Sequence, residues 1–159
     1  MDGITAAKLT EIAVRLLTAT LGTLGFALMF RVSAKRLPFA VLGGFITWLV
    51  YEAVAIFTPQ IVAASFISAL VMALYSETMA RIFGAPTILF LLTGAVPIVP
   101  GNGLYQSIRS LMLGDMANFA VTARATLETL IGITVGLGVA SILVGIVLQL
   151  IKHSKKASK

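Results

Sequence analysis

The chain has 159 residues, of which 58% are hydrophobic and 11% charged, and its formal net charge is +6. A soluble domain carries about 25% charged residues, so this composition excludes an ordinary water-soluble fold. It favours an all-α integral membrane protein with about five transmembrane helices of ~20 residues each. Cysteine is absent, which excludes disulfides, thiol nucleophiles and cysteine-ligated zinc.

Apolar segments follow one another along the chain, separated by turn residues and charged loops. The first segment is expected to be retained, because the N-terminus mixes acids and bases and lacks a signal-peptide pattern. The whole chain, residues 1–159, is expected to form one polytopic membrane domain. The predicted spans are residues 12–30, 39–57, 61–82, 86–100 and 126–151, with an extramembrane or re-entrant amphipathic helix at 104–114 and a basic tail at 152–159.

Positive charges gather in two places, the loop containing Arg31, Lys35 and Arg36 and the lysine tail. With five spans both clusters fall on one side of the membrane, which the positive-inside bias makes the cytoplasmic side. The C-terminus is therefore expected in the cytoplasm and the N-terminus outside. Clusters at the ends of apolar segments argue against nucleic-acid binding.

Small residues recur within the predicted spans. Gly132 and Gly136 form a GxxxG pair, a pattern that lets two helices approach closely in lipid. Two interpretations remain open: packing inside one helix bundle, or contact with a second subunit.

The fourth predicted span is short and interrupted. Proline removes a backbone donor and clashes with the preceding turn, so the sequence predicts irregular backbone from about Thr93 to Gly103. Irregular backbone at membrane depth is tolerated where it lines a cavity, and transporters use such breaks as substrate sites. The alternative is a proline kink followed by a surface loop. The residues that carry this prediction are Gly94, Pro97, Pro100, Gly101, Asn102 and Gly103.

After the break a helix is expected to restart, with Asn102 as its N-cap. The positive end of that helix would point into the break. Tyr105 and Arg109 lie one turn apart on the same face. Together these features predict a donor-rich, electropositive site that suits a carboxylate.

Charged residues within the spans fall into two kinds. Glu52 is a candidate for a solute or proton pathway, because an acid within a span is costly; the alternative is an interfacial residue paired with an arginine. Two pairs have i,i+4 spacing and are predicted to be structural: Glu77 with Arg81, and Arg124 with Glu128. No catalytic set, metal-ligand spacing or cofactor motif is present, so neither an enzyme nor a metal or cofactor site is expected.

The residues around the break resemble the threonine/serine exporter (ThrE) superfamily, and more narrowly its small YjjB-like subunit, equivalent to the C-terminal module of the fused exporters. The upstream stretches GFALMF (residues 25–30) and GGFITWLVY (43–51) also look like that module. The matching positions at and before the break are Glu77, Ala80, Arg81, Pro86, Gly94, Pro97, Pro100, Gly101 and Tyr105.

The resemblance implies a secondary exporter in the plasma membrane of a prokaryote, working with a YjjP-like larger membrane subunit. It implies a small carboxylate solute, either an amino acid such as threonine or serine or a dicarboxylate such as succinate. Other readings are a self-sufficient homo-oligomeric transporter or channel, a membrane enzyme acting on a lipid, and a purely structural membrane subunit.

Overall fold

The computed structural model describes the backbone of residues 6–157 and the side chains of residues 10–150, so the side chains of the predicted basic tail lie outside the described part. The described chain is helical throughout apart from short connections. Its elements are α1 (Ala6–Met29), α2 (Leu37–Phe57), α3 (Ile61–Phe83), α4 (Thr87–Ala95), the short 3₁₀ helix η1 (Val96–Ile98), α5 (Gly101–Met112) and α6 (Met116–Ala157).

Four described helices, α1, α2, α3 and α6, are long and apolar enough to cross a membrane. The segments Thr87–Ile98 and Gly101–Met112 are bent by 52° at their junction and make a fifth span if they are counted together. The predicted all-α membrane fold with a broken fourth segment is therefore confirmed.

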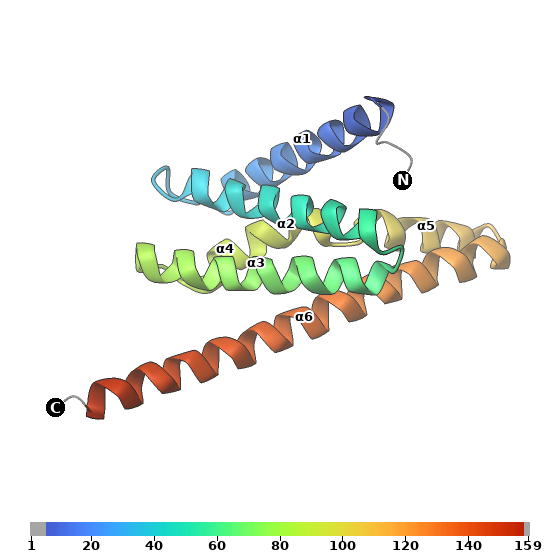
Figure 1. The fold of residues 1–159 in the computed structure, drawn as a ribbon. Helices are drawn as coiled ribbons and strands as arrows, with labels where there is room; N and C mark the ends of the chain where they lie inside the picture. Colours follow the sequence, from blue (N-terminus) through green and yellow to red (C-terminus); the bar gives the residue numbers. More distant parts are fainter. Residues whose placement is uncertain (1–5, 158–159) are drawn as a thin grey trace.

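The long helices run back and forth between two ends of the molecule (Figure 1). We call one the basic end: it holds the loop of residues 30–36, the turn after α3 and the end of α6. The opposite, far end holds the start of α1, the turn of residues 58–60 and the loop of residues 113–115. Helices α2 and α3 lie side by side, α1 packs on α2, and α6 crosses α3 obliquely.

Helix ends follow local chemistry. Pro38 lies in the first turn of α2, where its missing N–H costs nothing. Gly84 ends α3 in the left-handed conformation, with φ 55°, and its N–H donates to the Ala80 carbonyl. That geometry favours glycine because it has no Cβ.

Close helix packing depends on glycines and on small polar residues. A Cβ on Gly44 in α2 would lie 2.1 Å from Thr23 Oγ1 in α1. A Cβ on Gly132 would lie 2.6 Å from the Val62 carbonyl oxygen, and one on Gly136 would lie 2.6 Å from that of Phe66. The GxxxG pair thus packs α6 onto α3 of the same chain, which favours the first of its two interpretations.

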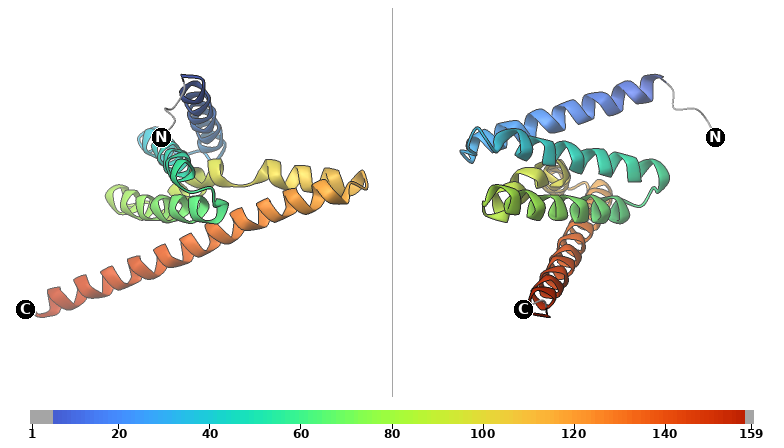
Figure 2. Two further views of the ribbon diagram at one scale, coloured as in Figure 1. Left: turned by 45° about the vertical axis from the view of Figure 1, so that its right-hand side comes forward. Right: turned by 60° about the vertical axis from the view of Figure 1, so that its left-hand side comes forward.

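Helix α6 is longer than the predicted span of residues 126–151. Its 42 residues extend about 63 Å at 1.5 Å per residue, roughly twice the ~30 Å hydrocarbon core. The start of α6 pairs with α5 as a hairpin, and its C-terminal part diverges from the other helices (Figure 2). Residues 116–125 hold no proline or glycine, so the helix continues through them.

Candidate functional site

The break between α4 and α5 is narrower than the sequence predicts. Thr93 and Gly94 remain inside α4, and Gly101 to Gly103 form the first turn of α5. Only Val99, with φ −64° and ψ 123°, and Pro100, with φ −79° and ψ 54°, leave helical geometry. Gly101 to Gly103 enter the helix because first-turn N–H groups need no intrahelical acceptor.

A cavity of about 470 Å³ lies at this break. We call it the break cavity. The α2 helix contributes Trp48 and Tyr51 to its wall, and α3 contributes Ile61. None of its lining side chains is charged. The remaining lining residues are Pro97, Ile98, Val99, Pro100, Gly101, Asn102, Gly103 and Gln106 from the broken segment and Thr122, Ala125, Thr126 and Thr129 from α6.

The start of α5 offers free backbone donors to the break cavity. The Gly101 N–H donates to the Val99 carbonyl and the Leu104 N–H to the Pro100 carbonyl. No side chain caps the helix, so the prediction of Asn102 as N-cap is wrong; Pro100 occupies that position, because the helix begins at Gly101. Among the described residues, the N–H groups of Asn102 and Gly103 have no acceptor. Such groups at a positive helix end attract an anion.

The α6 wall of the break cavity, which adjoins the start of α5, offers acceptors. Thr122, Thr126 and Thr129 lie on one face of α6, and each hydroxyl donates to the carbonyl four residues earlier, at 2.8, 2.7 and 2.9 Å respectively. With their protons committed, these hydroxyl oxygens present lone pairs to a donor. The break cavity therefore combines donors from α5 with acceptors from α6.

An aromatic pair closes the α2 side of the cavity. The rings of Trp48 and Tyr51 stack with centroids 5.1 Å apart and planes inclined by 14°. The indole N–H of Trp48 is buried and has no acceptor among the described residues. An unpaired buried donor costs about 1–3 kcal/mol, so this wall is not optimised for stability alone.

Glu52 lies beside this site but outside it. Its side chain is buried, and Arg15 of α1 donates to Glu52 Oε1 at 3.4 Å and to Glu11 Oε1 at 2.7 Å. Glu52 does not line the break cavity. This placement matches the alternative of an acid paired with an arginine.

Both i,i+4 pairs are present. Arg124 Nε donates to Glu128 at 2.8 Å. Arg81 pairs with Glu77 Oε1, and Thr87 Oγ1 of α4 donates to Glu77 Oε2 at 2.7 Å. Glu77 therefore links α3 to the start of α4 and does more than pair along its own helix.

The comparison with protein families decides the identity. The family described as "Threonine/Serine exporter, ThrE" matches residues 15–143 of this chain. The chain belongs to this family. No curated protein and no solved structure matches it. The exporter is thus a multi-pass membrane transporter, and membership of a transporter family agrees with the expectation that the chain is not an enzyme.

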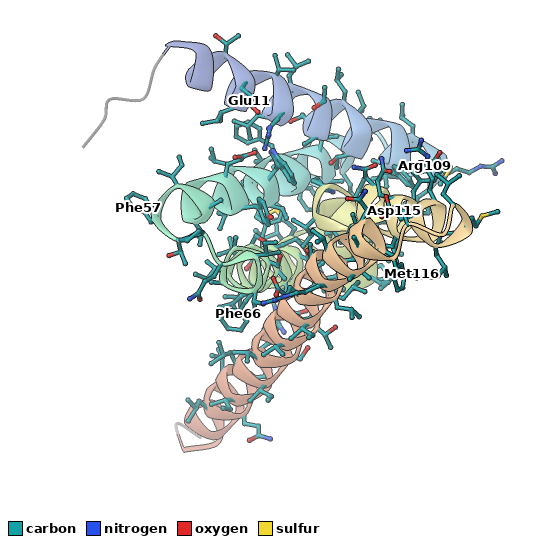
Figure 3. The ribbon with its side chains drawn as sticks, turned by 90° about the vertical axis from the view of Figure 1, so that its right-hand side faces the viewer. Glu11, Phe57, Phe66, Arg109, Asp115 and Met116 are labelled. Carbon is teal, nitrogen blue, oxygen red and sulfur yellow. The ribbon has the colours of Figure 1, made fainter. Side chains whose placement is uncertain are left out.

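Only some of the predicted site residues of the exporter lie at the break cavity. Four of the predicted solute-binding residues line the break cavity and three do not. The four are Pro97, Pro100, Gly101 and Asn102. Gly94 packs against Met72, where a Cβ would lie 3.1 Å from Met72 Cγ. Tyr105 is 63% exposed. Arg109 lies on the α5–α6 hairpin near Asp115 and Met116, at the far end (Figure 3).

Sequence reasoning missed the walls that other helices contribute. Trp48 and Tyr51 are three residues apart in α2, and Thr122, Thr126 and Thr129 follow helical spacing in α6. Hydroxyls repeated on one helical face next to the broken segment were a usable signal. Which helix faces the break, however, is a property of the tertiary packing.

Proposed function

We propose that this exporter is the small subunit of a two-component secondary transporter, and that the break cavity holds its solute. The family supports a threonine/serine exporter-type transporter. The observation that carries the site is the break cavity, which is lined by the broken segment and uncharged throughout. Irregular backbone facing a cavity is how transporters commonly build solute sites.

The proposed solute is a small amino acid such as threonine or serine. Its carboxylate meets the free N–H groups of Asn102 and Gly103, and its ammonium and hydroxyl groups meet the threonine oxygens of α6. A dicarboxylate would leave one negative charge in a cavity with no lining cation. Because Arg109 does not line the cavity, we assign the binding of the solute carboxylate to the start of α5.

The proposed partner is a YjjP-like larger membrane subunit, which the resemblance to the C-terminal module of fused exporters supports. We place the basic end in the cytoplasm of a prokaryotic cell, because Arg31, Lys35, Arg36 and Arg81 lie at that end. The C-terminus is then cytoplasmic and the N-terminus outside.

Efflux of labelled threonine tests the proposal. Cells carry this chain alone, the larger subunit alone, or both. Rapid efflux is expected only with both chains. Equal efflux from this chain alone would favour a self-sufficient homo-oligomeric transporter, and no efflux in any strain would contradict export of threonine.

A further inference from the structure

A second set of cavities lies between α3, α4 and α6, toward the basic end. Two adjoining hollows of about 290 and 310 Å³ share Glu77 and Val144 in their linings. We call them together the α3–α6 groove. The groove exists because α6 touches α3 at Gly132 and Gly136 and then diverges from it (Figure 2).

An apolar cluster lies between this groove and the break cavity. The buried residues Ala69, Met72 and Ile98 form its centre, with partly buried neighbours around them. Ile98 also lines the break cavity, while Leu91 and Leu137 pack against the same centre and line the groove. The groove and the break cavity therefore border the same apolar cluster, which we call the Met72–Ile98 plug.

The groove differs from the break cavity in its charge. It carries one acid, Glu77, and one base, Arg81, within an otherwise uncharged lining. Hydroxyls of Thr87 and Ser141 lie on the same walls. Glu77 accepts one bond at each oxygen, from Arg81 and from Thr87.

Neither charged group is saturated by the contacts that it makes. A carboxylate has about four lone-pair sites and a guanidinium has five N–H donors. A small zwitterion can therefore add its ammonium to Glu77 and its carboxylate to Arg81 without breaking the existing pair. A dicarboxylate would bring two negative charges to a site with one cation.

We propose that the α3–α6 groove is a second binding site, for a small zwitterionic solute, on the basic-end side of the Met72–Ile98 plug. The ammonium group binds Glu77 and the carboxylate binds Arg81. This inference rests on the proposed export function, for which it supplies a place where the solute binds before it passes the plug.

Cysteine labelling tests the groove directly, because the natural chain contains no cysteine. Ser141→Cys places a thiol in the groove, and Ile142→Cys, at a position 64% exposed and outside its lining, is the neighbouring control. A charged, water-soluble maleimide is added to each full-length variant in lipid nanodiscs. Ser141→Cys is expected to react readily, and Ile142→Cys slowly, because an exposed side chain within an apolar span faces lipid rather than water. An unreactive Ser141→Cys would mean that lipid or a protein segment fills the groove, and would overturn the proposal.

Protection by solute tests the ligand. Threonine at about ten times its dissociation constant is expected to slow labelling of Ser141→Cys about tenfold, while succinate leaves the rate unchanged. Adding Glu77→Gln is expected to weaken threonine binding roughly tenfold or more and so abolish most protection. Glu128→Gln, which alters an i,i+4 pair outside the groove, should leave the protection by threonine unchanged. Equal protection by succinate, or full protection in Glu77→Gln, would overturn the proposal.

Labelling needs no transport, so the two proposals fail separately. If threonine protects Ser141→Cys from labelling but no strain shows efflux, the proposed export function is contradicted and the proposed binding site is supported. If efflux requires both chains but threonine does not protect Ser141→Cys, the export function is supported and the groove binding site is contradicted.

Discussion

Gly103 of α5 lies so close to Thr126 of α6 that a Cβ on Gly103 would be 2.5 Å from Thr126 Oγ1. This contact holds the start of α5 against the threonine face of α6. Both residues line the break cavity, so the same contact fixes the distance between its donor wall and its acceptor wall.

Gly103→Ala should force α5 away from α6. Overpacking of this kind costs about 1–3 kcal/mol, and we expect a lower melting temperature together with weaker threonine binding. Gly101→Ala is the matched control, because a Cβ there has no neighbour within 4 Å. Adding Thr126→Ala to Gly103→Ala removes the clashing oxygen and should restore much of the stability. Equal stability of the two single glycine variants would contradict this account.

The glycine pair of α6 makes a second prediction. Gly136→Ala would put a Cβ 2.6 Å from the Phe66 carbonyl oxygen, which is backbone and cannot rotate away. We expect a loss of roughly 1–3 kcal/mol in thermal unfolding with no change in oligomeric state by light scattering. Gly138→Ala, with open space around the new Cβ, should be neutral. A stable Gly136→Ala chain with an altered oligomeric state would instead assign the pair to a subunit contact.

Trp48 provides a direct reporter of the break cavity, because it is the only tryptophan of the chain. Threonine is expected to change its fluorescence in a saturable way, since the ring lines the cavity. Threonine methyl ester has no carboxylate to meet the start of α5 and should produce little change at equal concentration. An equal fluorescence change with both compounds would show that the start of α5 does not bind the solute carboxylate.

Asp115 gives the fold a dependence on pH. It accepts the Asn118 N–H at 3.1 Å and the Asn118 side-chain amide, and these hydrogen bonds lower its pKa below the ordinary value. Its stabilising effect is therefore complete above the ordinary carboxyl pKa of about 3.9 and is lost as the pH falls through the lower folded value. Melting curves between about pH 2 and 5 should show this loss in the natural chain and less of it in Asp115→Ala. Identical pH profiles would contradict the role of Asp115.

Much of the fold follows from local rules. Prolines and glycines set the ends of the helices and mark the break at Pro97 to Gly101, because each restricts or frees the conformation of its own backbone. The composition and the lengths of the apolar segments predict the membrane helices for the same reason. The span predicted at residues 126–151 covers only part of α6, because the amphipathic residues before it continue the helix and pack against α5.

The candidate site was predictable only in part. The expectation for Arg109 assumed a helix beginning near residue 104, but α5 begins at Gly101. Arg109 then lies eight residues along the helix, or about 12 Å from its start. The aromatic pair of α2 and the threonines of α6 come to the break through tertiary packing, which no local pattern reports.

Blocking the break cavity in the complete exporter tests the central claim most directly. Thr122→Cys lines the cavity, whereas Val121→Cys lies beside it at a position 68% exposed and outside the lining. Cells carrying both subunits are treated with maleimide, and efflux of labelled threonine is measured before and after. The account predicts that modification stops most efflux through Thr122→Cys and leaves Val121→Cys unaffected. Undiminished efflux through fully modified Thr122→Cys would show that the solute does not pass through the break cavity.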